Sequence, residues 1–122
     1  MVVSETILTR GGVYLARLDP AKAAEIGKIR PVVIFTAQPI LDINPPILFA
    51  CPLSSQSQPA FNGLHVQLYA RDKLEVTSYA LVEHCRAISA RRIIFPRLAQ
   101  LTASEIYLIL HRLQELVGLS PQ

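Results

Sequence analysis

The stretch EIGKIRPVVIF, residues 25–35, joins a polar, glycine-containing approach to an apolar run rich in β-branched residues. That composition predicts a central strand over residues 30–37. Pro31 fits only at the start of such a strand, because proline has no N–H for the hydrogen-bond ladder. Arg30 therefore stands at the edge of the predicted sheet, where a permanent charge has either a structural or a chemical purpose.

Other stretches have the residue pattern of shorter strands. Residues 64–70 alternate apolar and polar, which predicts a half-exposed strand with His65 and Gln67 on its polar face. Residues 90–94 predict a short helix or an extension of the strand before them. The remaining predicted strands cover residues 11–18, 47–53 and 77–88. Segments rich in proline and polar residues predict loops at residues 19–28, 38–46 and 54–63.

The C-terminal segment has a different periodicity. Thr102 followed by Glu105 is a capping box, and Gly118 is a candidate C-cap. Apolar residues between them recur at helical spacing: Ile106, Ile109, Leu110, Leu113, Leu116 and Val117. Several short strands followed by one amphipathic helix predict a mainly β fold with helices (α+β). We expect a small antiparallel barrel or curled sheet with the helix packed on it.

Length and composition indicate a single folded domain over residues 1–122, with 51% hydrophobic and 17% charged residues. The net charge is +3, from 12 Lys and Arg against 9 Asp and Glu, which permits an anionic partner without requiring one. No apolar run reaches the roughly 18 residues of a membrane span, and the N-terminus lacks a basic signal-peptide region. We therefore expect a cytoplasmic protein whose two cysteines, Cys51 and Cys85, are reduced.

Familiar catalytic and metal-binding motifs are missing from the sequence. The histidines and cysteines form no Cys-x-x-Cys or His-x-x-x-His pair, so no metal site or cofactor is expected. No Gly-x-Ser-x-Gly segment suggests a serine nucleophile, and Gly11 and Gly12 precede a predicted strand where a phosphate-binding loop would precede a helix.

Arg30 and Ser54 gain interest from their positions in the predicted sheet. Arg30 begins one strand and Ser54 follows the next, so antiparallel pairing would make them neighbours at one rim. A structural alternative is a salt bridge from Arg30 to Glu25 that closes the edge of the sheet. The residue pattern alone favours this alternative.

Three separated segments change that balance. They are RGGVYLARLDPAKAAEIGKIRPVVI (residues 10–34), PLSSQ (52–56) and SYALVEHCRAI (78–88). In order and spacing they resemble the MazF/PemK family of toxin endoribonucleases, over roughly the whole chain. The resemblance implies an SH3-like or CcdB-like barrel that forms homodimers. It also implies a type II toxin that cleaves single-stranded RNA at short sequences without a metal, leaves a 2′,3′-cyclic phosphate, and is blocked by a cognate antitoxin.

The resemblance also implies roles for individual residues. The family's catalytic arginine falls on Arg30, its catalytic threonine on Ser54, and its strand acid on Glu83, the one family-matched carboxylate that could act as a base. A guanidinium suits a phosphate transition state, and a serine hydroxyl can donate to a phosphate oxygen. The substrate-binding candidates are Glu25, Lys28, Gln56, His84 and Arg86.

The sequence departs from the family pattern in three places. Gly12 replaces an acidic residue, Ala23 and Ala24 replace a Gly-Ser pair, and His84 replaces a glutamine. Two other functions therefore compete with the nuclease: a catalytically inactive relative that binds RNA or antitoxin, and a CcdB-like gyrase inhibitor. Retention of Arg30 and Ser54 favours the nuclease over both.

Overall fold

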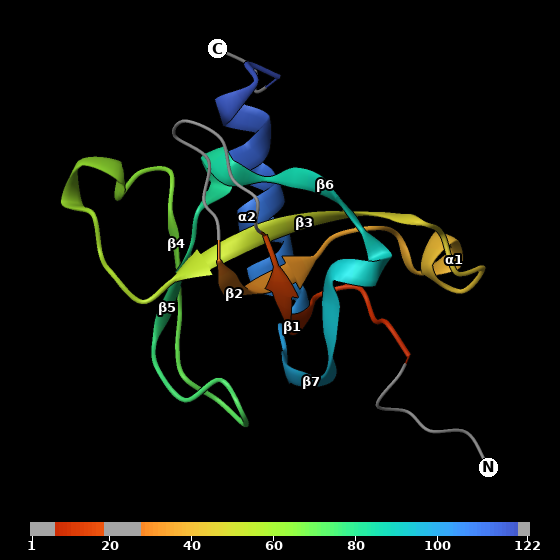
Figure 1. Ribbon diagram of the computed structural model, residues 1–122. Coiled ribbons are helices and arrows are strands. Elements are labelled where there is room, and N and C mark those ends of the chain that lie inside the picture. Colours follow the sequence, from red (N-terminus) through yellow and green to blue (C-terminus); the bar gives the residue numbers. More distant parts are fainter. Residues whose placement is uncertain (1–6, 19–27, 120–122) are drawn as a thin grey trace.

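The computed structural model describes residues 7–18 and 28–119 as a curved antiparallel sheet with one long helix against it (Figure 1). The expected mainly β fold with a C-terminal helix is confirmed. Among the described residues, no helix combines the length and hydropathy that a bilayer crossing requires. The strands are β1 (Gly12–Arg17), β2 (Ile29–Ile34), β3 (Ile47–Ser54), β4 (Val66–Leu68), β5 (Ser78–Ala80), β6 (Arg86–Ser89) and β7 (Ile93–Gln100).

All of the helices except the last one are short. They are α1 (Gln38–Leu41), η2 (Pro59–Phe61), η3 (Val82–His84), η4 (Ala90–Arg92) and α2 (Ala103–Leu116), the η elements being single 3₁₀ turns. The α2 helix begins as expected, since Thr102 accepts from the Glu105 N–H and Glu105 accepts from the Thr102 N–H. Gly118 has a φ of 78°, a left-handed value that suits glycine after a helix end.

The sheet order is β4-β5-β3-β2-β1-β7, and β6 pairs with the other half of β3. Two cores lie on its two faces. One core, which includes Val33, Cys51 and Leu53, packs against Ile109 of α2. The other, which includes Tyr14, Val32, Ala50 and Ile88, lies on the opposite face. We call the first face the helix face and the second the inner face.

The structure corrects the expected loop at residues 38–46, because α1 occupies its first part. Pro39 is compatible with the first helical turn, where the backbone N–H has no helical partner. Leu41 is buried in the inner core, and the Gln38 side chain accepts from the Arg10 N–H. Tertiary burial therefore stabilises a helix too short to be recognised from periodicity.

The predicted strand over residues 77–88 is two strands, β5 and β6, separated by η3. In the β3–β5 pairing Leu53 faces Ala80, whereas in the β3–β6 pairing Ala50 faces Arg86. The register therefore shifts by three residues between the two pairings, and η3 forms a bulge of three residues between β5 and β6. Glu83 is therefore on a turn and not on a strand.

Two further expectations about strands need correction. The sequence indicated no strand over β7, which pairs with β1 across a register shift and contains Pro96 and Arg97. The 64–70 strand is limited to β4, and His65, expected on its polar face, is buried. The short helix expected near residue 90 is confirmed as η4, and the loop at 54–63 contains η2. The predicted loop at 19–28 lies almost wholly outside the described residues.

Candidate active site

The strand register brings Arg30 and Ser54 together on the inner face. Val32 pairs with Pro52 across β2 and β3, and continuing this register by two residues sets Arg30 opposite Ser54. Directly opposite residues in an antiparallel pair direct their side chains to the same face of the sheet. The expected neighbourhood at the rim therefore follows from the observed register, and both residues are half-buried.

The same register extends this pair into a row across four strands. Ser54 is opposite Tyr79 on β5, and Tyr79 is opposite Gln67 on β4. We call Arg30, Ser54, Tyr79 and Gln67 the polar row. Tyr79 is half-buried and Gln67 is exposed, so the row becomes more open toward β4. Tyr79 and Gln67 were not among the residues expected at the site, since only the pairing of β4 and β5 places them there.

Ser54 is held in a defined orientation by the loop that follows it. The backbone N–H of Gln56 donates to Ser54 Oγ at 3.1 Å. The hydroxyl oxygen is thereby used as an acceptor, which directs the hydroxyl hydrogen toward other acceptors. Gln56, a substrate-binding candidate, thus acts on the site through its backbone, while its side chain is exposed.

Arg86 shares the inner face with this row. Arg86 is opposite Ala50 on β3, four residues before Ser54 on the same strand, so both side chains leave the sheet on one side. Its Nη1 atom is buried without a hydrogen-bond partner among the described residues. A buried guanidinium donor without a partner has unused capacity for an acceptor such as a phosphate oxygen.

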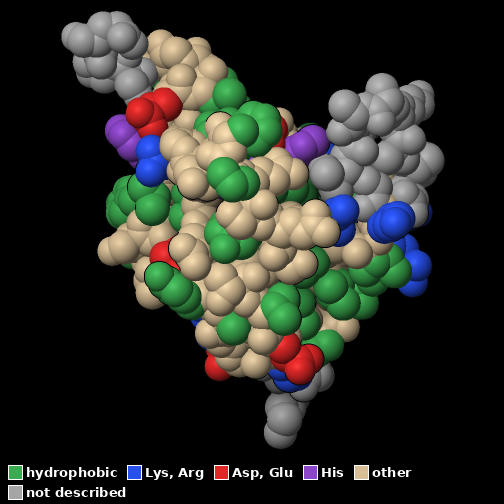
Figure 2. All heavy atoms as spheres, turned by 90° about the vertical axis from the view of Figure 1, so that its left-hand side faces the viewer, with side chains coloured by type: hydrophobic (Ala, Val, Ile, Leu, Met, Phe, Trp, Pro, Cys, Tyr) green, Lys and Arg blue, Asp and Glu red, His purple; other side chains and the backbone are tan. Residues whose placement is uncertain are grey.

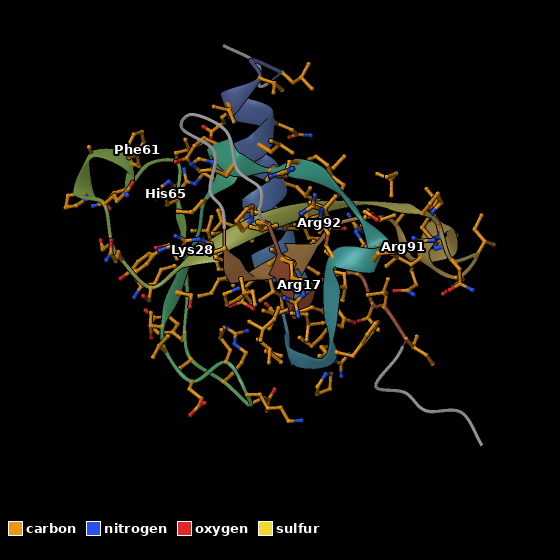
Figure 3. All side chains as sticks on the ribbon, in the orientation of Figure 1. Arg17, Lys28, Phe61, His65, Arg91 and Arg92 are labelled. Atoms are coloured by element: carbon orange, nitrogen blue, oxygen red, sulfur yellow. The ribbon has the colours of Figure 1, made fainter. Side chains whose placement is uncertain are left out.

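The Glu83 side chain does not join the polar row. Its two carboxylate oxygens each lie 2.8 Å from His65 Nε2, and it lines a groove beside α2 on the helix face. His84 Nε2 lies 4.0 Å from the same carboxylate. The His65 ring is stacked on Phe61, with ring centroids 5.3 Å apart (Figure 3). The catalytic role of Glu83 stays a prediction, and the structure engages its carboxylate with a buried histidine.

Basic side chains gather on the side of the molecule opposite α2. Figure 2 shows several Lys and Arg side chains along one edge of the face that carries β4 and β5. Lys28 precedes β2 and is exposed, and Arg17 ends β1 and is also exposed. Arg92 Nη1 donates to the Arg17 backbone oxygen at 2.8 Å, which fixes Arg92 beside Arg17 (Figure 3). This basic edge lies close to the start of β2, where Arg30 is located.

A polar hollow adjoins the other end of the row. Its volume is about 460 Å³, and Tyr79 and Gln67 form part of its wall. The remaining lining residues are Ser57, Gln58, Asn62, His65, Val66, Tyr69, Leu108 and Arg112. Amide and aromatic side chains of this kind can hydrogen-bond and stack with a flat polar ring such as a nucleobase.

The structure also explains one of the departures from the family pattern. A Cβ atom at Gly12 would lie 2.7 Å from Thr9 Oγ1 and from a Tyr14 ring carbon, so the position has no room for an acidic side chain. Ala23, Ala24 and Glu25 lie outside the described residues, and so does the expected Glu25 salt bridge. Within the part of the chain that the structure describes, no group of three His, Cys, Asp or Glu side chains could hold a metal ion.

Comparison with known proteins identifies similar chains. A family model for the PemK-like, MazF-like toxin of type II toxin–antitoxin systems matches residues 9–117. A relative named endoribonuclease MazF, from Staphylococcus saprophyticus subsp. saprophyticus, is 32% identical over 88 residues, which is 71% of this chain and 72% of that protein.

Solved structures share the fold. A crystal structure of MazF from Deinococcus radiodurans superposes with a TM-score of 0.73 at 21% identity, covering 92% of this chain and 97% of that one. A MazE–MazF crystal structure from the same organism gives 0.72 at 22% identity, covering 93% and 98%. The Mycobacterium tuberculosis toxin MazF-mt6 gives 0.72 at 17% identity, covering 90% and 99%.

Proposed function

Because the chain belongs to the PemK-like, MazF-like toxins of type II toxin–antitoxin systems, we propose that it is a metal-independent endoribonuclease. Its substrate is single-stranded RNA, including mRNA, cut at short sequences in the cytoplasm. The observation that carries this proposal is the position of Arg30 and Ser54 opposite each other on the inner face. A guanidinium and a hydroxyl on neighbouring strands can contact the same phosphate.

The proposed reaction uses the RNA as its own nucleophile. The 2′-hydroxyl oxygen forms a bond to phosphorus and loses its proton, while the bond from phosphorus to the 5′-oxygen breaks and that oxygen gains a proton. The products are a 2′,3′-cyclic phosphate and a 5′-hydroxyl. Arg30 stabilises the added negative charge on the phosphate, because its guanidinium stays charged and matches two phosphate oxygens. Ser54 donates its hydroxyl hydrogen to a phosphate oxygen.

The surroundings of the row supply a path for the RNA strand. Lys28, which is exposed before β2, and Arg86, which shares the inner face with Ser54, are proposed to contact phosphates next to the cleaved one. Tyr79 and Gln67 continue the row by one and two strands, or about 5 and 10 Å at normal strand spacing. That distance suits the nucleotide next to the cleaved bond. The polar hollow is therefore proposed to hold a base and to contribute to sequence preference.

The proposed partners follow from the family. We propose that the chain acts as a homodimer and that a cognate antitoxin covers the RNA-binding surface. The MazE–MazF structures from Deinococcus radiodurans concern the toxin of that organism together with MazE. The basic edge supports the proposal that an acidic antitoxin segment competes with RNA, because the same Lys and Arg side chains would attract both.

The test is incubation of the purified protein with single-stranded RNAs of varied sequence in EDTA. The proposal expects cleavage at defined sites and products with 2′,3′-cyclic phosphate and 5′-hydroxyl ends, identified by mass spectrometry. Intact RNA across all sequences would refute it and would favour an inactive relative or a gyrase inhibitor. Cleavage that stops in EDTA would refute the metal-independent mechanism.

A further inference from the structure

The two cysteines lie opposite each other on neighbouring strands of the sheet. The β3–β6 register sets Ala50 opposite Arg86, and continuing it by one residue sets Cys51 opposite Cys85. Directly opposite residues of an antiparallel pair have Cα atoms about 4.5–5.5 Å apart. This separation falls inside the range of about 4.4–6.8 Å that a disulfide bond spans. The continued register therefore gives these residues the spacing that a disulfide bond requires.

The side chains of the two cysteines lie in the same part of the core. Cys51 belongs to the core of the helix face, and Cys85 packs against that core. The Cys51 thiol donates to the Pro52 backbone oxygen at 3.7 Å. Both are free cysteines.

The two thiols differ in access to solvent. Cys51 is fully buried, whereas Cys85 is half-buried and lines a groove of about 420 Å³ between α2 and η3. A small molecule can therefore reach Cys85 first. The neighbouring Cys85 thiol and burial raise the pKa of the Cys51 thiol. Cys51 therefore suits the second step, after Cys85 has reacted.

We propose that Cys51 and Cys85 form a reversible dithiol–disulfide site that is oxidised by a small peroxide. The Cys85 sulfur attacks one peroxide oxygen, the O–O bond breaks, and the thiol proton leaves with the departing hydroxide as water. The Cys51 sulfur then attacks the resulting Cys85 sulfenic acid, the S–O bond breaks, and the Cys51 proton leaves with that hydroxyl as a second water. Two thiols are oxidised and one peroxide is reduced to two waters.

The new bond ties β3 to the junction of η3 and β6. β3 carries Ser54, and η3 carries Glu83 and His84, so the bond fixes the bulge beside the segments that hold the candidate site. A cross-link between residues 51 and 85 also restricts the unfolded chain. We expect the oxidised protein to melt at a temperature at least about 5 °C higher than the reduced protein.

The test treats the full chain with hydrogen peroxide, quenches it with an alkylating reagent under denaturing conditions, and measures the intact mass. No RNA is needed, so this result is independent of the proposed function. The expected product is a monomeric chain lighter by about 2 Da with no alkylated cysteine, restored by dithiothreitol. Melting curves of the oxidised and reduced forms follow.

Two variants serve as controls. In Cys51→Ala, Cys85 should form a sulfenic acid that dimedone traps, and the melting shift should vanish. In Cys85→Ala, buried Cys51 should stay unreacted in the folded protein. The inference is overturned if oxidised wild type keeps two alkylatable thiols, forms only disulfides between chains, or accumulates oxygen on Cys85 while Cys51 stays reduced.

Discussion

Replacing His65 with phenylalanine tests whether the buried pair with Glu83 stabilises the fold. His65→Phe keeps a ring of similar size stacked on Phe61 and removes the N–H that donates to the carboxylate at 2.8 Å. Hydrogen bonds to charged groups contribute about 1.5–3 kcal/mol. Two effects reduce the expected cost. The Glu83 side chain is 26% exposed and can bind water, and the buried Nδ1 atom, which has no partner among the described residues, is removed. The expected loss is therefore about 1–2 kcal/mol in the free energy of unfolding.

His65→Ala separates packing from hydrogen bonding. This variant also removes the ring. Because the His65 side chain is only 4% exposed, the loss in the free energy of unfolding should increase to about 3–4 kcal/mol. Urea unfolding at pH 7 gives both values, with equal m-values as the check on two-state behaviour. A double-mutant cycle of His65→Phe with Glu83→Ala should give a coupling energy of about 1–2 kcal/mol. A coupling near zero, or a His65→Phe variant as stable as wild type, would refute the stabilising role of the pair.

Three further predictions concern other parts of the chain. Arg71 donates two hydrogen bonds to Glu105 at 2.6 Å, which lowers the pKa of the Glu105 carboxyl, so their contribution is complete above the ordinary glutamate pKa and is lost as the pH falls through the lowered one. Glu105→Gln should cost about 1 kcal/mol at pH 7, with the difference from wild type narrowing as the pH falls below the ordinary glutamate pKa in urea titrations. Gly11→Ala should cost about 2–4 kcal/mol in the same assay, because φ is 80° and a Cβ would lie 2.4 Å from a side-chain carbon of α2. Its control is Gly118→Ala, which has a φ of 78° in open space and should cost about 1 kcal/mol. Equal costs for the two variants would show that the close contact at Gly11 is absent. Tyr79→Ala should weaken binding of an uncleavable RNA by about 1–3 kcal/mol, measured by fluorescence anisotropy, and unchanged binding would remove Tyr79 from the RNA path.

Features determined by neighbouring residues in sequence could be predicted. The α2 helix begins at the capping box and ends beside Gly118 because Thr102 and Glu105 satisfy the first backbone N–H groups locally. By contrast, β7 contains Pro96 and Arg97, which break the pattern of a strand. It forms because its backbone pairs with the neighbouring strand β1. The η3 bulge is equally invisible in sequence, since residues 77–88 read as one extended segment.

The same distinction between local and long-range determinants applies to the candidate site. Arg30 and Ser54 could be placed together because two consecutive strands were predicted to pair antiparallel. Tyr79 and Gln67 required the register of β3, β5 and β4, which no local pattern specifies. The partner of Glu83 was also hidden, because His65 is 18 residues away and an alternating pattern assigned it to the polar face.

The most direct test of the central proposal is a double-mutant cycle on RNA cleavage with Arg30→Ala and Ser54→Ala. Single-turnover rates are measured in EDTA with one RNA of known cleavage site, and circular dichroism confirms that each variant is folded. Removing one donor to a phosphate transition state costs about 10²–10³-fold in rate, so each single variant should fall in that range.

If Arg30 and Ser54 act on the same phosphate, the double variant should be little slower than Arg30→Ala alone. Losses that multiply would show that the two residues act independently, and an Arg30→Ala variant that cleaves at the wild-type rate would place the active site elsewhere.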